Sequence, residues 1–366
     1  MTVTGKGILK KALPLLFFLL CVFFLAGCSK LTENRVSDQE QSVTQKEITD
    51  PGEPISRDLF AMDTFMTLTV YGEDAQDALD AAEAEISRLD ELLSTGMEDS
   101  EISQLNRNGE TILSDDPAYL YERSLEVNKM TDGAFDPMIY PLMEAWGFTT
   151  REYAVPDQEM LLRLLDLTDL SDVSYSPEDH HIVFEKEGMA IDFGGIAKGY
   201  TSASVIDILK EKGIGHAVIS LGGNVQVLGT KPDGTLWKVA IRDPQNISGF
   251  IGIAQVSDKA VITSGGYERF FEENGKIYHH ILDPSTGYPA ENGLLSVTVI
   301  SEDGTLADAL STALYVMGLE PAEQVWRDNR DLFDAVFVTD SGKLYITEGI
   351  RDSFLTDYYP VNIIRQ

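Results

Sequence analysis

Five short segments of alternating apolar and polar residues follow one another between residues 216 and 263, with only short turns between them. This pattern predicts strands at 216–220, 224–229, 237–242, 249–256 and 260–263. Parallel neighbours need a crossover connection of about a dozen residues or more, so strands this close together must pair antiparallel.

Other segments flank this block with helical or strand periodicity. Helices are expected at 74–93, from Pro117 to Gly133, at 196–212 and at 306–317, and strands at 65–72, 294–300, 334–339 and 343–347, the last two closing the chain. Because no internal repeat or second linker interrupts the pattern, we expect one α+β domain over residues 58–366.

The chain is strongly acidic, which excludes one large class of partners. Its 366 residues contain 28 Lys and Arg against 60 Asp and Glu, a formal net charge of −32. Nucleic-acid binding needs clustered cations, so no nucleic-acid partner is expected. An anionic ligand must instead be held by backbone dipoles, a metal ion or a few placed cations. The apolar content of 43% is ordinary for a globular protein and allows a substantial core.

The N-terminus has the features of a targeting segment. Three lysines precede an apolar run at 12–27, which is shorter than the ~20 residues of a membrane-spanning helix. The run ends in Leu-Ala-Gly-Cys at 25–28, which resembles the lipobox of bacterial lipoprotein signal peptides. Residues 1–27 are therefore expected to be a signal peptide, and Cys28 the lipidated residue that anchors the protein on the extracytoplasmic face of the cell membrane. The alternative is an uncleaved anchor helix.

Residues 28–57 are polar and contain no aromatic side chain, so they are expected to form a flexible tether. The only cysteines of the chain are Cys21 and Cys28. The domain that follows therefore has no thiol for a disulfide, a metal site or a nucleophile.

Three windows carry residue types suited to phosphate chemistry, although each also has a purely structural interpretation. In the first, DFGGIAKGY at 192–200, two glycines precede a helix. Gly194 and Gly195 would let a phosphate approach the amides of a helix N-terminus, and Lys198 would add a positive charge. The alternative is an ordinary glycine turn, since neither the three-glycine dinucleotide motif nor a Walker A spacing is present.

The second window, YHHILDPSTGYP at 278–289, places two adjacent histidines and Asp283 beside a turn. Either His279 or His280 could act as an acid or base at a phosphoryl or hydroxyl group. Alternatively, one histidine faces the core and its neighbour faces solvent, as adjacent residues of a strand do. The window lacks the spacing of a zinc protease.

The third window, ADALSTALYVMG at 307–318, puts Asp308 and Thr312 on one face of a helix. One carboxylate and one hydroxyl suit Mg²⁺, which keeps water ligands and takes further oxygens from substrate phosphates. In the structural alternative, Asp308 interacts with the helix dipole and Thr312 bonds back to a carbonyl.

Together these windows resemble the ApbE family, the FAD:protein FMN transferases. The resemblance rests on eight ordered motifs: Met62-Asp63-Thr64, LSTGMEDSEISQLN (93–106), DGAFDP (132–137), DFGGIAKGY, ISLGGNVQVLG (219–229), VITSGGYERFF (261–271), HILDPSTGYP (280–289) and ADALSTAL (307–314). It implies one α+β domain with a T-fold-like antiparallel sheet. It also implies Mg²⁺-dependent transfer of FMN from FAD to a threonine hydroxyl of an exported acceptor protein, with release of AMP.

The resemblance also assigns roles by position. FAD would contact Met62, Ala134, Phe135, Asp136, Asp192, Lys198 and Leu282. Mg²⁺ would be held by Asp308, Thr312 and a backbone carbonyl of the turn that begins at Gly195. His280 and Asp308 would be the catalytic residues.

One position departs from the family pattern. Gly96 stands where the family commonly has a tyrosine that would stack on a ring of FAD, a contact expected to contribute about 1 kcal/mol. Met97 could partly fill the gap. Because family members without the aromatic can hydrolyse FAD, a Mg²⁺-dependent FAD pyrophosphatase is one alternative function, and a non-catalytic, lipid-anchored flavin-binding protein is another.

Overall fold

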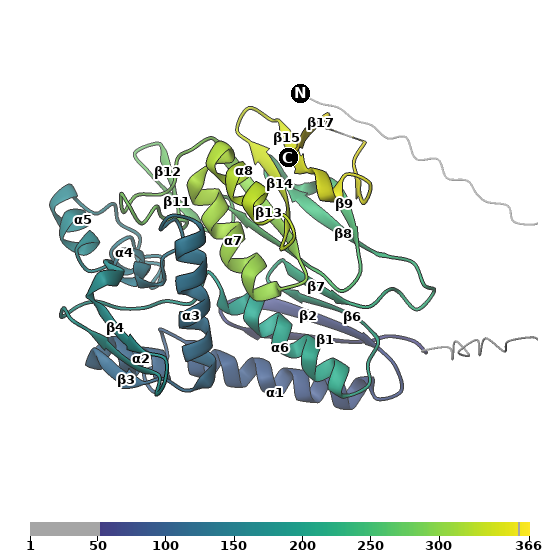
Figure 1. Ribbon diagram of the computed structural model, residues 1–366, viewed down its shortest axis with the longest axis horizontal. Helices are drawn as coiled ribbons and strands as arrows, with labels where there is room; N and C mark the ends of the chain where they lie inside the picture. Colours follow the sequence, from purple (N-terminus) through teal and green to yellow (C-terminus); the bar gives the residue numbers. More distant parts are fainter. Residues whose placement is uncertain (1–51, 358) are drawn as a thin grey trace, which may run out of the picture. The chain divides into compact units, whose positions relative to one another are not determined.

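A sheet of nine strands forms the centre of this computed structural model, which describes residues 52–357 and 359–366 (Figure 1). The strands, in their order across the sheet, are β1 (Ile55–Ala61), β2 (Thr64–Tyr71), β6 (His216–Leu221), β7 (Asn224–Leu228), β10 (Ala260–Gly265), β13 (Leu294–Ser301), β14 (Asp334–Thr339), β15 (Leu344–Thr347) and β17 (Val361–Ile364). All neighbours pair antiparallel except β15 and β17.

Three smaller sheets accompany it in the described residues. They are β8 (Trp237–Asp243), β9 (Asn246–Val256) and β16 (Phe354–Leu355); β3 (Glu110–Ile112), β4 (Val173–Ser176) and β5 (His181–Phe184); and the hairpin β11 (Phe270–Glu273) with β12 (Lys276–His279). The antiparallel pairing predicted for closely spaced strands is confirmed for β6 with β7 and for β8 with β9.

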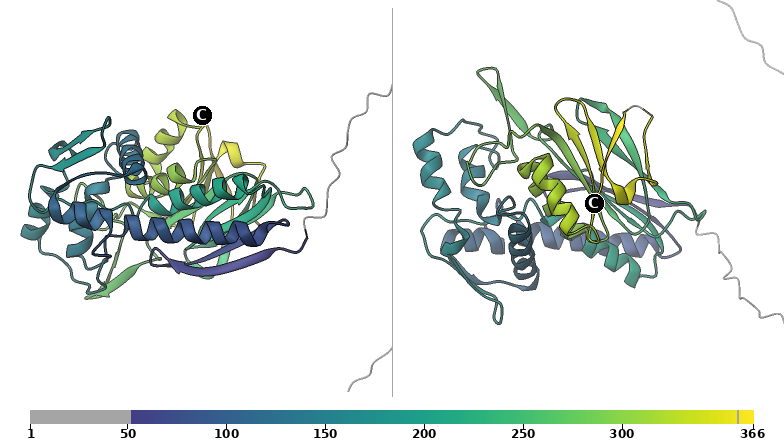
Figure 2. Two further views of the ribbon diagram at one scale, coloured as in Figure 1. Left: turned by 90° about the horizontal axis from the view of Figure 1, so that it is seen from below. Right: turned by 45° about the horizontal axis from the view of Figure 1, so that its top comes forward.

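Helices cover one face of the large sheet. They are α1 (Ala75–Leu93), α6 (Ala197–Glu211), α7 (Gly304–Met317) and α8 (Leu319–Asp328). Figure 2 shows α1 and α6 side by side above β1 and β2. The sheet of β8, β9 and β16 covers the opposite face through a separate apolar cluster that includes Trp237, Val239 and Phe354. The large sheet is therefore covered by a layer of helices on one face and by a small sheet on the other.

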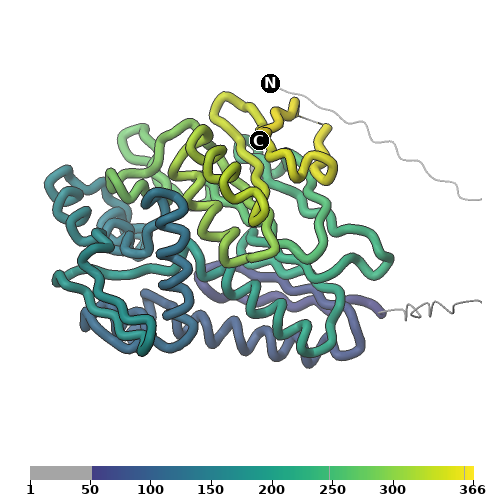
Figure 3. Tube along the Cα trace, in the orientation of Figure 1, coloured from purple at the N-terminus to yellow at the C-terminus, as the bar shows by residue number. Residues whose placement is uncertain are grey.

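The chain between α1 and α6 forms a distinct region at one end of the large sheet, as Figure 3 shows by the blue and teal part of the trace. It contains α2 (Glu101–Asn108), α3 (Asp115–Met130), α4 (Tyr140–Ala145), α5 (Gln158–Leu165), the sheet of β3, β4 and β5, and short 3₁₀ turns at Pro137–Ile139 and Leu170–Asp172; a third lies at Glu348–Ile350. Residues of α3 pack on α7 and join this region to the helical layer.

Two boundaries differ from the sequence prediction. Strand β1 begins at Ile55, so residues 55–57, expected in the tether, belong to the sheet. They pair with β2, which follows β1 after a two-residue turn. The polar composition of residues 55–57 gives no sign of this strand in the sequence. The expected final strand, β15, is followed by β17, which pairs parallel to it after a loop.

The predicted signal peptide at 1–27, the lipidation site Cys28 and the tether up to residue 51 lie outside the described residues. Within the described ranges, none of the helices has both the length and the apolar character needed to cross a membrane.

Candidate active site

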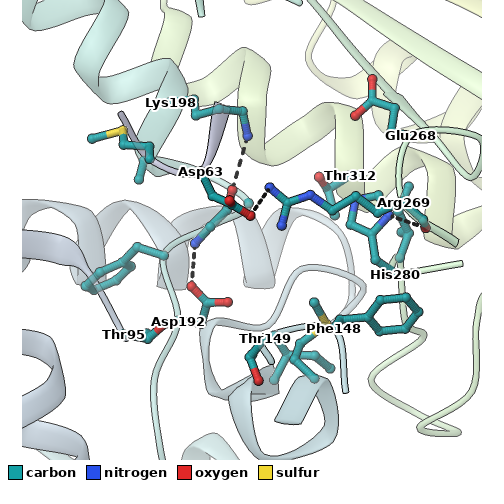
Figure 4. Close-up of a pocket in the computed structure, with 18 of the residues that line it drawn as sticks. Asp63, Thr95, Phe148, Thr149, Asp192, Lys198, Glu268, Arg269, His280 and Thr312 are labelled. Atoms are coloured by element: carbon teal, nitrogen blue, oxygen red, sulfur yellow. Dashed lines mark hydrogen bonds and ion pairs between the residues drawn. The ribbon is translucent and has the colours of Figure 1, made fainter. Parts of the chain in front are cut away.

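A cavity of about 930 Å³ opens where the region between α1 and α6 faces the end of the large sheet (Figure 4). The β1–β2 turn, the start of α6, one side of α7 and the base of the β11–β12 hairpin all contribute to its wall. Every residue to which the family resemblance assigns a role in FAD binding, metal binding or catalysis lines it: Met62, Ala134, Phe135, Asp136, Asp192, Gly195, Lys198, His280, Leu282, Asp308 and Thr312. Motifs far apart in the chain therefore meet in one place.

The turn before α6 differs from a simple phosphate-binding loop. The Gly194 amide, expected to face a phosphate, donates a hydrogen bond of 2.8 Å to Asp192 Oδ1. The Gly199 amide, in the first turn of α6, donates one of 2.8 Å to Asp308 Oδ2. Amides that the sequence predicted to bind a ligand therefore donate to carboxylates of the protein itself. Lys198 is the cation that α6 contributes to the cavity wall.

Asp308 is fixed by its neighbours. Its Oδ1 accepts a hydrogen bond of 2.8 Å from Asn224 Nδ2, in addition to the bond from Gly199. Helices α6 and α7 approach closely here, since a methyl group on Gly199 would lie 2.6 Å from Asp308 Cβ. The side chain is only 4% exposed, and burial raises the pKa of Asp308 above its usual value. The Lys198 charge and the hydrogen bonds from Gly199 and Asn224 act in the opposite direction and favour its charged form.

Asp308 and its surroundings fit a magnesium ion. Thr312 lies one helical turn along α7, its Oγ1 is 3.1 Å from Ser264 Oγ, and a methyl group on Gly195 would lie 3.9 Å from it. The corner thus offers one carboxylate, hydroxyls and the backbone of the Gly195 turn. Among the described residues no cluster of three or more His, Cys, Asp or Glu is suited to a metal. One carboxylate with neutral oxygens is the donor set of Mg²⁺, which completes its shell with water and phosphate oxygens.

The charge of the whole cavity supports the same conclusion. Seven carboxylates line it, against four Lys and Arg: Asp63, Asp90, Asp136, Glu144, Asp192, Glu268 and Asp308 face Arg151, Lys198, Arg242 and Arg269. A pyrophosphate group would be repelled by this excess of negative charge. A divalent cation at Asp308 would offset most of this excess.

The two adjacent histidines separate as strand neighbours do. His279 packs edge-on against Tyr315, and its Nε2 lies 3.1 Å from the carbonyl oxygen of Ala290. His280 lines the cavity, and its Nδ1 lies 3.2 Å from the carbonyl oxygen of Arg269. Burial and the Arg269 charge lower the pKa of His280 to about 3, so the ring is neutral at pH 7. With the proton on Nδ1 facing the carbonyl, Nε2 is an acceptor.

Two further carboxylates occupy the part of the cavity next to the DGAFDP turn. Asp136 accepts a hydrogen bond of 2.8 Å from the Met138 amide, and burial raises its pKa to about 6. Burial also raises the pKa of Asp192. The turn itself is held by Asn128, whose Nδ2 donates a bond of 2.7 Å to the Phe135 carbonyl. When protonated, a carboxyl group here can both donate to and accept from the polar groups of a ligand.

Gly96, which stands where the family commonly has a ring-stacking tyrosine, lines the cavity. Its φ lies outside the left-handed region, and the nearest atom to an added Cβ would be Ser94 Oγ, 3.9 Å away. The position is therefore open to a larger side chain. Met97, expected to fill part of the gap, is 43% exposed and is not part of the cavity wall.

Several lining residues were not singled out from the sequence. Asp63, in the β1–β2 turn, pairs with Arg151 at 2.7 Å and with Arg269 at 3.3 Å (Figure 4). Asn224 orients Asp308, and Glu268 lies near Lys198 and Arg242. Of these additional residues, Asp63, Asn224, Glu268 and Arg269 fall within the quoted motifs and Arg151 does not. Only their tertiary neighbours distinguish them from ordinary turn residues.

Comparison with known proteins agrees with this site. The model of the ApbE family matches residues 62–337. The FAD:protein FMN transferase of Klebsiella pneumoniae (strain 342) is 33% identical over 273 residues, which cover 74% of this chain and 84% of that protein. That of Treponema pallidum (strain Nichols) is 31% identical over 318 residues, covering 81% and 88%. The crystal structure of the ApbE protein from Thermotoga maritima has a TM-score of 0.76 at 32% identity and covers 82% of this chain and 99% of that one. The expected α+β fold is confirmed.

Proposed function

Because the chain belongs to the ApbE family, we propose that it transfers FMN from FAD to a threonine hydroxyl of an exported acceptor protein, with Mg²⁺ bound and AMP released. The observation that carries the proposal is the convergence of the predicted FAD, metal and catalytic residues on one cavity. The relatives are named for the same reaction, and the predicted transferase class agrees with their name.

The proposed transfer forms one P–O bond, breaks another and needs a base for the hydroxyl proton. The acceptor hydroxyl oxygen bonds to the phosphorus of the FMN half of FAD, the bond from that phosphorus to the bridging oxygen breaks, and AMP leaves with the bridging oxygen. The hydroxyl proton passes to a base, and His280 Nε2 is the neutral acceptor available in the cavity. The negative charge of a bound pyrophosphate raises the low pKa of His280 when the substrate is in place.

Lys198 and Arg269 face the same space and stabilise charge on the transferring phosphate. Asp308 and Thr312, with a backbone carbonyl of the Gly195 turn, would hold Mg²⁺, which adds Lewis-acid stabilisation when bound. Asn224 and Gly199 keep the Asp308 carboxylate aimed into the cavity.

An acceptor screen tests the proposal. The purified domain, FAD and Mg²⁺ are incubated with the envelope-protein fraction of the producing bacterium, and labelled protein is detected by flavin fluorescence in a denaturing gel and by intact mass. We expect one or more proteins to gain the mass of FMN less one water through a threonine, while AMP appears in equal amount. AMP without a labelled protein would instead identify a pyrophosphatase, and neither product would identify a flavin-binding protein.

Gly96 favours hydrolysis of FAD as the second candidate activity, because the open position leaves room beside the ligand. Gly96→Tyr should tighten FAD binding by about tenfold, equivalent to about 1.4 kcal/mol, and lower AMP release relative to transfer. Calorimetric titration of FAD into both forms measures the first effect, and AMP release with and without acceptor the second. Equal affinities and an unchanged ratio would show that the open position does not govern the outcome.

We further propose that Cys28 carries lipid and anchors the protein outside the cytoplasmic membrane. The Leu-Ala-Gly-Cys sequence and the polar stretch after it support this location. Cys28→Ala should leave the protein soluble or unprocessed in a membrane fractionation. Unchanged membrane attachment would contradict lipidation at this residue.

A further inference from the structure

Two β-hairpins meet at the mouth of the cavity. The turn between β1 and β2, Met62-Asp63, lines the cavity on one side. Arg269 and His280, which directly precede β11 and follow β12, line it on the other. The ion pair of 3.3 Å between Asp63 and Arg269 joins the two hairpins. In the left panel of Figure 2 both lie along the lower edge of the domain, in purple and in green.

Both hairpins present apolar side chains to solvent. Phe60 and Phe65 are cross-strand partners on the sheet face opposite the helices, and they are 70% and 61% exposed. Phe270 and Ile277 share the outer face of the β11–β12 hairpin and are 49% and 56% exposed. We call these four residues the mouth surface. Exposed apolar groups gathered on both sides of one opening are typical of a protein-binding site.

The inner face of the two-stranded β11–β12 hairpin packs on aromatic rings of the region between α1 and α6. Phe271, on its inner face, stacks on Tyr153 with ring centroids 5.0 Å apart and on Tyr278 at 5.4 Å. In the described part of the chain no third strand pairs with either edge. The hairpin therefore offers an ordered template to which an extended segment can add by main-chain hydrogen bonds.

We propose that the mouth surface binds the acceptor protein as an extended segment, which brings its hydroxyl residue to His280. This inference rests on the proposed transfer reaction. A hydroxyl carried by a folded protein must approach the phosphate through the mouth, and each residue of the mouth surface lies within three residues, along the chain, of one that lines the cavity. Apolar side chains on either side of the hydroxyl residue would contact Phe60 and Phe65 on one hairpin and Phe270 and Ile277 on the other.

Other occupants fit less well. A net charge of −32 repels an anionic lipid surface. The strand β1 begins at Ile55 and is seven residues long, so its first residue lies about 20 Å from the turn at the mouth. An N-terminal membrane anchor would therefore be attached at the end of β1 that is away from the mouth. A second copy of the chain would bring like charge together and would obstruct the opening through which an acceptor must reach the phosphate.

Double variants on each hairpin test the proposal. Phe60→Ser/Phe65→Ser and Phe270→Ser/Ile277→Ser remove the apolar groups, and Phe60→Leu/Phe65→Leu retains them. The control is Ile112→Ser/Leu162→Ser, two residues with 67% and 62% exposure that do not line the cavity. The probe is the protein that the acceptor screen labels, purified and supplied at increasing concentration, with FAD affinity and acceptor-free AMP release measured in parallel.

We expect each serine pair to raise the KM for the acceptor at least tenfold while FAD affinity and acceptor-free AMP release stay within twofold. The leucine pair and the control should behave as the parent protein. An unchanged KM would overturn the mouth surface as the docking site. So would a change confined to sedimentation behaviour or to binding of phosphatidylglycerol vesicles, which would assign the surface to a second copy or to a membrane. If the parent protein labels no acceptor at all, the transfer proposal itself fails, and this inference with it.

Discussion

Gly199 controls the distance between the two helices that form the centre of the site. It lies in the first turn of α6, where α7 crosses, and a methyl group on it would lie 2.2 Å from the Gly304 carbonyl oxygen and 2.6 Å from Asp308 Cβ. Neither contact involves the flexible end of a side chain. Gly199→Ala therefore requires α6 and α7 to separate by about 1 Å, the amount that restores normal van der Waals distances.

The cost follows from two opposing contributions. Overpacking of this kind destabilises a core by about 1–3 kcal/mol, and the better helix propensity of alanine returns up to about 1 kcal/mol. The net loss of about 1–2 kcal/mol should lower the unfolding midpoint by about 2–4 °C for a domain of this size. The larger effect is on function, because a shift of about 1 Å in a catalytic group can lower turnover a hundredfold.

Thermal unfolding and Mg²⁺-dependent AMP release measure the two effects separately. Gly215→Ala is the matched control, since an added Cβ there meets no atom within 4 Å and the backbone is not left-handed. That change should leave activity unaltered and stabilise the fold by up to about 1 kcal/mol. If Gly199→Ala matched this control in both stability and Mg²⁺ dependence, close helix contact would not be what positions Asp308.

Three other predictions concern the carboxylates. Asp308→Asn keeps the shape of the side chain but removes the charge that would hold Mg²⁺, so AMP formation should vanish at every Mg²⁺ concentration while circular dichroism is unchanged; near-normal rates would make Asp308 a structural residue only. Asn224→Ala removes the 2.8 Å bond to Asp308 and should weaken Mg²⁺ binding about tenfold in a titration, an effect that equal midpoints would exclude. Because burial raises the pKa of Asp136 to about 6 from 3.8, the folded state binds its proton more tightly, and this group lowers stability as pH rises from about 4 through 6. Asp136→Asn should therefore raise the unfolding midpoint at pH 7.5 and not at pH 4, whereas the same shift at both values would point to a packing effect.

The sequence predicts most of the central sheet because its strands are regular and close together. The strands expected at 216–220, 224–229 and 260–263 appear as β6, β7 and β10 with ends shifted by at most two residues. The sequence pattern does not predict the hairpin β11–β12, since each of its strands is short and its inner face packs on rings from another region. Elements that depend on distant partners were missed for this reason.

The sequence likewise predicts some residues of the site and not the partners that position them. Residue types and motif order predict Asp308, Thr312, His280 and Lys198 as site residues, because phosphate chemistry needs a metal ligand, an acid–base group and a cation, and all four line the cavity. The partners of these groups come from other parts of the chain. The bond from Asn224 to Asp308 spans 84 residues, and nothing local distinguishes Asn224 from a turn asparagine.

The glycine-rich turn illustrates how tertiary structure changes the meaning of a motif. Considered alone, glycine amides ahead of a helix predict direct binding of a phosphate. In the folded chain Asp192 and Asp308 accept hydrogen bonds from amides of this turn and of the first turn of α6, so the partial positive charge of the helix end stabilises the Asp308 carboxylate instead. The helix end then favours the ionised form of Asp308, which burial opposes. A cation bound to that carboxylate would lower the repulsion between this acidic cavity and a pyrophosphate, so we expect the affinity of the site for an anionic ligand to depend on Mg²⁺ more than on the glycine loop.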